Sequence, residues 1–227
     1  MFNHNNHFID SNVILGFIID WDGLSSKCQK YFQYACNRYA SDNVYGECES
    51  VLSDVKDWVL KFIHSLSKKS PINAEYFVND LKDLIDKTAS NLSHNSSEYQ
   101  KITNVLKSFS EHHEDELRNL MTGTHQYKPF RKAITNAFKT TRKNFLTVFN
   151  SIIQKINNHP VSMNFSYRTH FLKRQIHKKD FDIILDAYHV SDTYLKDKMA
   201  FITFDKGITA VKFTIEQEFR FKVFEPP

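Results

Sequence analysis

The sequence predicts an α/β protein, and two stretches far apart in the chain support this prediction. Phe8-Ile9-Asp10 and Phe201-Ile202-Thr203-Phe204-Asp205 are short apolar runs that each end in an aspartate. Each has the composition of a buried strand that presents a carboxylate at its carboxyl end. In open α/β sheets, ligands bind at this end of the strands. The alternative for Asp10 is that its side chain only caps the helix that follows.

The composition limits the size and class of the protein. The chain has 227 residues, of which 41% are hydrophobic and 14% aromatic. This is enough for one large domain, or for a domain with an insertion. Glycine occurs only 5 times, and neither a P-loop nor a dinucleotide-binding fingerprint is present.

The cysteines and the hydropathy pattern indicate a cellular compartment. Cys28, Cys36 and Cys48 do not have metal-ligand spacing, and their odd number does not suggest a disulfide scaffold. The N-terminal residues do not have the layout of a signal peptide. No apolar run approaches the ~18 residues that a membrane span requires. We therefore expect a soluble, cytoplasmic protein without a membrane partner.

The net charge of +4 conceals a strong asymmetry along the chain. The 63 residues from Leu117 to Lys179 contain 13 Lys and Arg residues and no Asp or Glu. The rest of the chain contains 17 basic and 26 acidic residues. A basic block of this length favours a surface for a polyanion, most simply a nucleic acid. The alternative is a basic face that is solvated or paired with the acidic part.

Helical periodicity predicts most of the remaining elements. We expect a helix over 25–39, a loop or N-cap at 41–43 and a second helix over about 45–64. On this second helix Glu47 shares a face with the apolar residues, whereas Glu49 lies roughly on the far side. A carboxylate on a buried face is costly and needs an explanation. Either Glu47 lines a site, or it caps the first turn of the helix.

The pattern stays helical from 73 to about 158, with breaks near 90–97 and 122–129. A basic stretch with interleaved aromatic residues follows at 168–179, a composition that suits phosphates and unstacked bases. Asp182 and Asp186 are four residues apart, so on a helix they share a face and repel one another unless a cation or another partner offsets them. A last strand is expected over about 220–224.

The acidic residues at strand ends and helix starts are expected to meet. In a parallel α/β sheet the carboxyl ends of strands and the N-termini of helices lie at the same edge. Clustered carboxylates without a basic partner repel one another, and a divalent cation removes that conflict. Mg²⁺ and Mn²⁺ prefer oxygen ligands and suit phosphodiester substrates, since such ions activate an attacking water and stabilise the leaving oxygen.

Four short motifs follow one another along the chain. They are Phe8-Ile9-Asp10-Ser11-Asn12-Val13-Ile14, Val44-Tyr45-Gly46-Glu47, Asp182-Ile183-Ile184-Leu185-Asp186-Ala187 and Phe201-Ile202-Thr203-Phe204-Asp205-Lys206. Each motif alone is short, but their order resembles that of the PIN-domain (PilT N-terminus-like) ribonuclease family. The resemblance covers roughly residues 5–65 and 175–225 and leaves the middle of the chain uncovered.

The resemblance implies a PIN-like α/β/α sandwich with a mainly parallel central sheet. Residues 1–227 would then form a single domain, and 66–166 would be a helical, basic insertion or an enlarged central region. The implied activity is that of an endoribonuclease, a hydrolase that depends on Mg²⁺ or Mn²⁺.

Motif positions imply a role for each site residue. Catalytic and metal-binding roles fall to Asp10, Glu47, Asp182 and Asp205, and Asp186 matches an additional metal-binding position. Ser11, Asn12 and Thr203 match supporting polar residues. Two choices stay open, because Glu47 competes with Glu49 and Asp182 competes with Asp180.

The basic stretch is expected to bind the RNA backbone, through Arg168, Lys173, Arg174, Lys178 and Lys179. Two other functions stay open. One is a toxin that a separate antitoxin-like protein neutralises, and the other is a PIN-like scaffold that binds nucleic acid or protein without cleaving it. A homodimer is a further possible partner arrangement.

Overall fold

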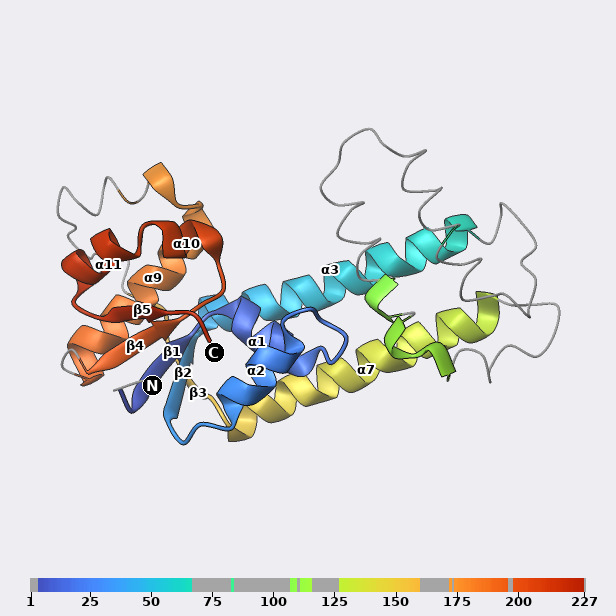
Figure 1. Cartoon of the computed structure of the whole chain (residues 1–227), viewed down its shortest axis with the longest axis horizontal. Coiled ribbons are helices and arrows are strands. Elements are labelled where there is room, and N and C mark those ends of the chain that lie inside the picture. Colours follow the sequence, from blue (N-terminus) through green and yellow to red (C-terminus); the bar gives the residue numbers. More distant parts are fainter. Residues whose placement is uncertain are drawn as a thin grey trace. The chain divides into compact units, whose positions relative to one another are not determined.

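The computed structural model describes residues 4–66, 83, 107–109, 111–115, 127–159, 172, 174–195 and 198–226 (Figure 1). The chain divides into two compact units. The first comprises Met1–Asp20, Leu24–Ser50 and Asn144–Pro227, and the second comprises Trp21–Gly23 and Val51–Lys143. The expected single domain with a helical region at 66–166 stays a prediction, because much of that region lies outside the described residues.

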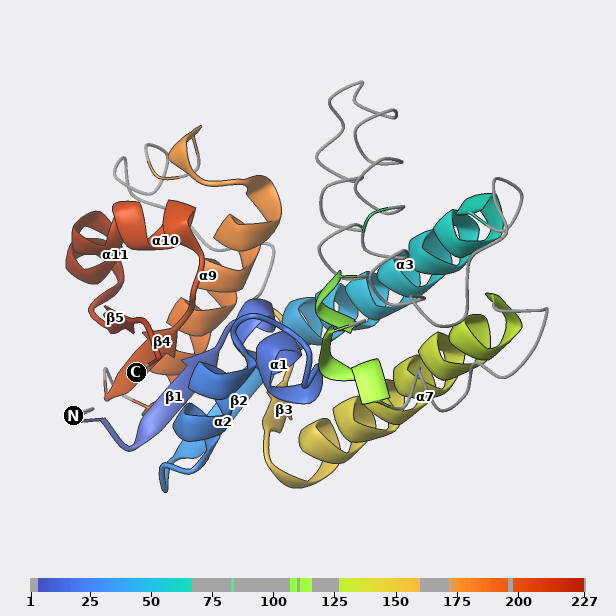
Figure 2. The same ribbon diagram turned by 45° about the vertical axis from the view of Figure 1, so that its right-hand side comes forward.

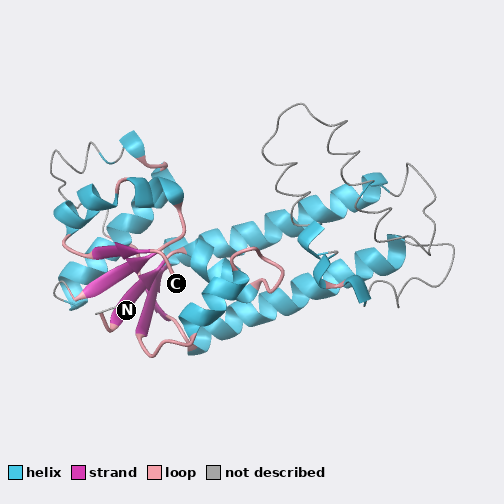
Figure 3. Ribbon diagram, in the orientation of Figure 1, coloured by secondary structure: helices cyan, strands magenta, loops and turns pink. Residues whose placement is uncertain are grey.

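A five-stranded sheet forms the centre of the first unit (Figure 3). Its strands are β1 (Asn6–Ile9), β2 (Asn37–Ser41), β3 (Gln154–Ile156), β4 (Met199–Ile202) and β5 (Lys222–Phe224). Their order is β3-β2-β1-β4-β5, and each neighbouring pair is parallel. The predicted α/β class is confirmed, as are the strands before Asp10 and Asp205, although β4 ends at Ile202, three residues before Asp205.

The helices of the first unit lie on both sides of this sheet (Figure 2). Helices α1 (Ser11–Ile18) and α2 (Ser25–Phe32) connect β1 to β2 on one side. On the other side lie α9 (Lys178–Val190), α10 (Lys206–Ala210) and α11 (Lys212–Phe219). A π-helical turn, η2 (Ser191–Leu195), follows α9. This layering is that of an α/β/α sandwich.

The strand order reverses between β1 and β4. From β1 the chain adds β2 and then β3 in one direction, and from β4 it adds β5 in the other. Right-handed crossovers place the connecting helices on opposite faces for these two directions. The carboxyl ends of β1 and β4 therefore form the topological switch point, where α/β sheets bind their ligands.

The two central strands are buried and hold the core together. Phe8 and Phe201 are paired across β1 and β4, and their rings stack with centroids 5.8 Å apart. Both side chains are fully buried, as are Ile9 and Ile202. Burying side chains of this size stabilises the fold by roughly 1.5–3 kcal/mol each. This core fixes the two strand ends that present Asp10 and Asp205.

The expected helix over 25–39 is wrong in its second half. Helix α2 ends at Phe32, and residues 37–41 form β2. The buried guanidinium of Arg38 donates hydrogen bonds to the carbonyls of Phe32 (3.0 Å) and Tyr34 (2.5 Å), which satisfies the end of α2. The next helix, α3 (Asp42–Leu66), begins directly after β2.

The end of the long central helical region also differs from expectation. Helix α7 (Tyr127–Ser151) ends several residues before 158, to which the helical pattern is expected to run, and β3 follows it. Gln154 and Lys155 of β3 are exposed, because this strand is at the edge of the sheet. Its pairing with β2 decides its conformation, and its side chains give no alternating apolar pattern.

The described part of the second unit contains a small aromatic core. The Trp21 ring packs edge-on against Phe109 and Phe138, with centroids 5.3 and 5.9 Å away. Ala133 and Ile134 of α7 are also buried. Nowhere in the described ranges is there a helix with the length and apolar character needed to cross a membrane.

Candidate functional site

Asp10 and Asp205 follow two neighbouring strands at the switch point. Ile9 and Ile202 are paired residues of β1 and β4, and the Asp10 amide donates to the Ile202 carbonyl (3.0 Å). Asp10 is the N-cap of α1, and Asp205 is the N-cap of α10. Both carboxylates thus lie at helix N-termini, where backbone N–H groups stabilise negative charge.

Asp10 is buried and accepts hydrogen bonds at both oxygens. Oδ1 accepts from the Ser11 amide (2.7 Å) and hydroxyl (3.3 Å), while Oδ2 accepts from Asn12 Nδ2 (2.8 Å) and Thr203 Oγ1 (2.5 Å). The residue is 4% exposed. Asp10 therefore does cap α1, but capping alone does not require the bonds from Asn12 and Thr203.

Asn12 and Thr203 connect the two loops that follow β1 and β4. Asn12 Oδ1 accepts from the Phe204 amide (3.0 Å), and Thr203 Oγ1 accepts from the Asp205 amide (2.9 Å). Thr203 is fully buried. These bonds fix the positions of the two aspartates relative to each other.

Burial raises the pKa of Asp10 to about 7. The hydrogen bond from Thr203 lowers the pKa, but the negative charges of Glu47 and Asp180 raise it further. Glu47 is on α3, and Asp180 is in the first turn of α9. Three elements that are distant in sequence therefore place carboxylates close enough to repel one another.

Asp180 is close to two more carboxylates. Its pKa is raised mainly by partial burial and then by the charges of Asp205 and Glu47, while His177 and Lys179 lower it. Asp10, Glu47, Asp180 and Asp205 are thus linked by mutual repulsion, and we call them the carboxylate cluster. Each comes from the carboxyl end of a strand or the first turns of a helix.

Glu47 has an unsatisfied atom in this cluster. Its Oε2 is buried and has no hydrogen-bond partner among the residues that the structure describes. The residue after it, Cys48, is buried against the start of α1, with its Sγ 3.7 Å from the Ser11 carbonyl. A buried carboxylate oxygen without a partner is costly. A group that bonds to Glu47 Oε2 would therefore stabilise this side chain.

Asp182 and Asp186 differ from Asp180 in their surroundings. Two residues correspond to about 200° around a helix, so Asp182 projects away from the face that contains Asp180. Asp186 is fully buried and accepts from Asn43 Nδ2 (2.9 Å) and from the backbone and ring of His159. The electrostatic contacts therefore favour Asp180 over Asp182, the residue chosen from the sequence.

The basic residues predicted to bind RNA are only partly described. Arg168 and Lys173 lie outside the described residues, whereas Arg174, Lys178 and Lys179 are exposed. Lys179 is close enough to Asp180 for its charge to lower that pKa. Exposed positive charge therefore borders the carboxylate cluster on the side of α9.

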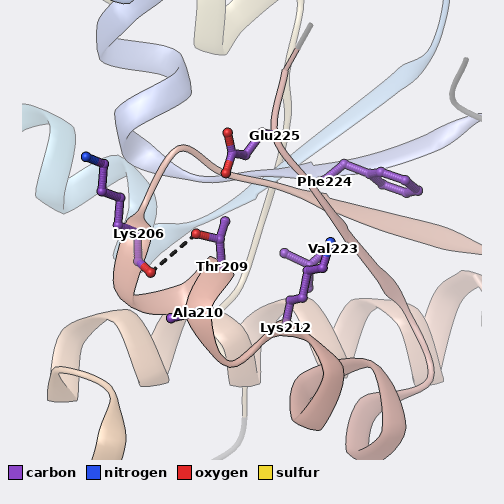
Figure 4. A pocket seen from close by; sticks show the side chains of 7 residues that line it. All are labelled: Lys206, Thr209, Ala210, Lys212, Val223, Phe224 and Glu225. Atoms are coloured by element: carbon purple, nitrogen blue, oxygen red, sulfur yellow. Dashed lines mark hydrogen bonds between the residues drawn. The ribbon is translucent and has the colours of Figure 1, made fainter.

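A pocket of about 480 Å³ lies beside the start of α10 (Figure 4). Figure 4 shows its lining residues on α10, at the start of α11 and along β5 and the segment after it: Lys206, Thr209, Ala210, Lys212, Val223, Phe224 and Glu225. Lys206 directly follows Asp205 in the chain. Lys206 and Lys212 thus line this pocket with two cationic side chains.

Gly207 lies directly against the Asp205 carboxylate. A Cβ atom at this position would lie 3.0 Å from Asp205 Oδ1, which is closer than side-chain contacts normally allow. Glycine at this position therefore lets Asp205 Oδ1 accept the capping hydrogen bond from the Ile208 amide (2.8 Å) without a close contact.

No protein-family model, curated protein or solved structure matches this chain. What defines the protein is thus its own geometry, which is a parallel α/β sheet with a carboxylate cluster at its switch point.

Proposed function

We propose that this protein is a metal-dependent endoribonuclease that hydrolyses RNA phosphodiester bonds, with a PIN-like fold and with Mg²⁺ or Mn²⁺ at the carboxylate cluster. The observation that supports this most strongly is the buried Glu47 Oε2, for which the described part of the chain provides no hydrogen-bond partner. It belongs to a side chain whose charge raises the pKa values of Asp10 and Asp180. A cation would satisfy this atom and offset the repulsion at once.

The donor set fits a hard divalent ion. Carboxylate oxygens are the ligands that Mg²⁺ and Mn²⁺ prefer, and the cluster offers four such groups. When bound, such an ion would lower the pKa of a water nucleophile and offset negative charge that develops on phosphate.

The chain's own residues would position the reactants. Ser11, Asn12 and Thr203 hold the Asp10 carboxylate in one orientation through short hydrogen bonds. Lys179 and Lys206 are exposed and flank Asp180 and Asp205 in sequence, so they can contact the phosphates on either side of the bond that breaks. Arg174 and Lys178 extend this basic surface along the chain.

The test is cleavage of a mixed-sequence single-stranded RNA with Mn²⁺, with Mg²⁺ or with EDTA. We expect cleavage only when a divalent ion is present. Glu47→Gln is expected to lower the rate at least 100-fold, because it removes the charge but preserves the size of the side chain. Glu49→Gln, two residues further along α3, is the matched control and should retain the wild-type rate within about twofold.

The possible outcomes separate the proposal from its alternatives. If RNA binds in a salt-sensitive manner but is not cleaved with any ion, the protein is a binding scaffold and the proposal is wrong. If Glu49→Gln is inactive and Glu47→Gln is active, the second metal ligand has been assigned to the wrong residue.

A second pair of variants tests the choice between two aspartates of α9. Asp180→Asn is expected to weaken Mn²⁺ binding by about 10-fold or more, since its charge interacts with Glu47 and Asp205. Asp182→Asn should change the affinity less than twofold. Isothermal titration calorimetry with Mn²⁺ measures both, and the opposite ranking would restore Asp182 as the ligand.

A further inference from the structure

The Asp186 side chain is fully buried, and hydrogen bonds reach both of its oxygens. Oδ1 accepts from the His159 amide (2.7 Å) and from the His159 ring Nδ1 (2.6 Å), and Oδ2 accepts from Asn43 Nδ2 (2.9 Å). These donors occupy three of the roughly four acceptor positions of a carboxylate. Asp186 therefore already has, within the protein, the partners that a buried charge requires.

The donors to Asp186 belong to two segments that follow neighbouring strands. Asn43 is in the first turn of α3, which begins directly after β2, and His159 comes shortly after β3. The two segments are also joined to each other, because the Asn43 amide donates to Asn158 Oδ1 (2.8 Å). Asp186 thus attaches α9, which also packs against β2, to the carboxyl ends of both strands.

One hydrogen bond joins α3, which carries Glu47, to α9, which carries Asp180. It runs from Asn43 to Asp186. Asn43 is four residues before Glu47, so both are on the same face of α3. Asp186 is six residues after Asp180, which corresponds to about 9 Å along α9 and about 240° around it. A shift or rotation of α9 that broke this bond would therefore move Asp180 relative to Glu47.

The other half of the carboxylate cluster is held by a comparable link. Asn12 and Thr203 connect the two loops that follow β1 and β4, each of which presents an aspartate. Asn43 and Asp186 connect the two helices that provide the remaining two carboxylates of the cluster. Because like charges on these helices repel one another, a link between the helices is needed to keep both carboxylates within reach of one ion.

We propose that Asp186 is a positioning residue of the metal site and not a metal ligand. Together with Asn43 it holds α9 against α3, so that carboxylates from both helices can bind the same ion. The inference rests on the proposed function for the presence of that ion. It replaces the metal-binding role that motif position implies for Asp186 with the role of a partner that orients the ligands.

Exchanging the two side chains tests this role. In Asp186→Asn alone, the carboxylate oxygen that bonds to Asn43 or one that bonds to His159 is replaced by an amide donor. In the double variant Asn43→Asp/Asp186→Asn, the hydrogen bond can form again in the opposite direction, and the amide oxygen at position 186 still accepts from His159. The double variant also has the same total charge as the wild type.

The Kd for Mn²⁺ distinguishes a positioning residue from a ligand. We expect Asp186→Asn to raise this Kd by about 10-fold or more, as removal of a residue that orients metal ligands typically does. The double variant should return the Kd to within about threefold of wild type. Isothermal titration calorimetry measures the Kd of each folded protein, and chemical denaturation in EDTA measures its free energy of unfolding.

Two further variants serve as controls. Ile215→Val removes one methylene group from a buried side chain of α11, so it lowers stability alone and should retain the wild-type Kd within about twofold. Asn43→Asp places two carboxylates against each other and should be less stable than the double variant. If Asp186→Asn does not fold, the Kd of the double variant decides the role of Asp186 by itself.

Two results would overturn the inference. If Asp186 is a metal ligand, the double variant lacks that ligand and its Kd stays far above that of the wild type. If Asp186→Asn is less stable but has the wild-type Kd, the hydrogen bond supports the fold alone. Failure of the nuclease proposal is a separate result, because these titrations contain no RNA. A wild type that binds Mn²⁺ without cleaving RNA contradicts the nuclease proposal, and the same titrations still decide the role of Asp186. A wild type that binds no Mn²⁺ contradicts both.

Discussion

Asp10→Asn is expected to lower metal-dependent RNA cleavage by about three orders of magnitude, the largest effect of any single substitution in the cluster. Asp10 is at the switch point and interacts electrostatically with Glu47 and Asp180. Asparagine has nearly the same shape but no negative charge. The Oδ1 that accepts from the Ser11 amide is retained, whereas an amide group would face the donors Asn12 Nδ2 and Thr203 Oγ1.

The measurement is single-turnover cleavage with Mn²⁺ in excess, together with the Tm of each protein. Asp192→Asn makes the same chemical change at an exposed position of η2 and should be fully active. RNA affinity of Asp10→Asn should be equal to or higher than that of the wild type, because a repelling charge is removed. Cleavage within tenfold of wild type, in a folded Asp10→Asn protein, would show that the carboxylate cluster is not the catalytic site.

The sequence alone predicts the parts of the candidate site that depend on local burial, which are the strand ends before Asp10 and Asp205. β1 and β4 are central strands, and their apolar runs end at Asp10 and Asp205 because the chain leaves the core there. Any residue at these two positions would lie at the carboxyl edge of a parallel sheet. The short polar residues that follow are those that a strand-to-helix turn requires.

The two missed strands show where local patterns are insufficient. β2 has the sequence Asn-Arg-Tyr-Ala-Ser and β3 has Gln-Lys-Ile, and neither has the apolar composition of a buried strand. Their conformation is decided by pairing with neighbours that are distant in sequence. As a consequence, the helical pattern that the sequence predicts up to about 158 runs through β3 and gives no sign of this strand.

The choice between Asp180 and Asp182 illustrates a different limit. The i, i+4 relation correctly places Asp182 and Asp186 on one face of α9, but it does not tell which face points to the other carboxylates. The start of the helix is the more informative signal. Because α9 begins at Lys178, its first turn contains Asp180, and the charges of Glu47 and Asp205 reach that residue.

The second large effect concerns the stability of the metal-free protein, which should depend on the protonation of Asp10. The pKa of Asp10 is about 7 in the folded state and 3.8 when the side chain is unperturbed. The folded state therefore binds this proton more tightly than the unfolded state. Its contribution to stability is present below pH 3.8 and is lost as the pH rises toward 7, with a total of about 4 kcal/mol.

Comparison of two proteins isolates this contribution. Between pH 6 and pH 8 the free energy of unfolding of the wild type in EDTA should fall by about 1 kcal/mol relative to that of Asp10→Asn. His7 acts in the opposite direction, because burial lowers its pKa to about 4 and its stabilisation is lost as the pH falls below 6.5. Both proteins contain His7, so its contribution cancels in the difference.

Metal binding should reverse the pH dependence of the free energy of unfolding of the wild type. A divalent ion competes with the proton on Asp10, so it binds more tightly as the pH rises through 7 and releases a proton below that pH. At 100 times its Kd, Mn²⁺ should stabilise the wild type by about 2.7 kcal/mol and Asp10→Asn by much less. Chemical denaturation at pH 6, 7 and 8, with Mn²⁺ or EDTA, measures all of these differences. If the difference in the free energy of unfolding between the wild type and Asp10→Asn in EDTA does not change with pH, Asp10 is already ionised in the metal-free fold. The repulsion that we assign to the cluster is then balanced by a cationic group of the protein itself.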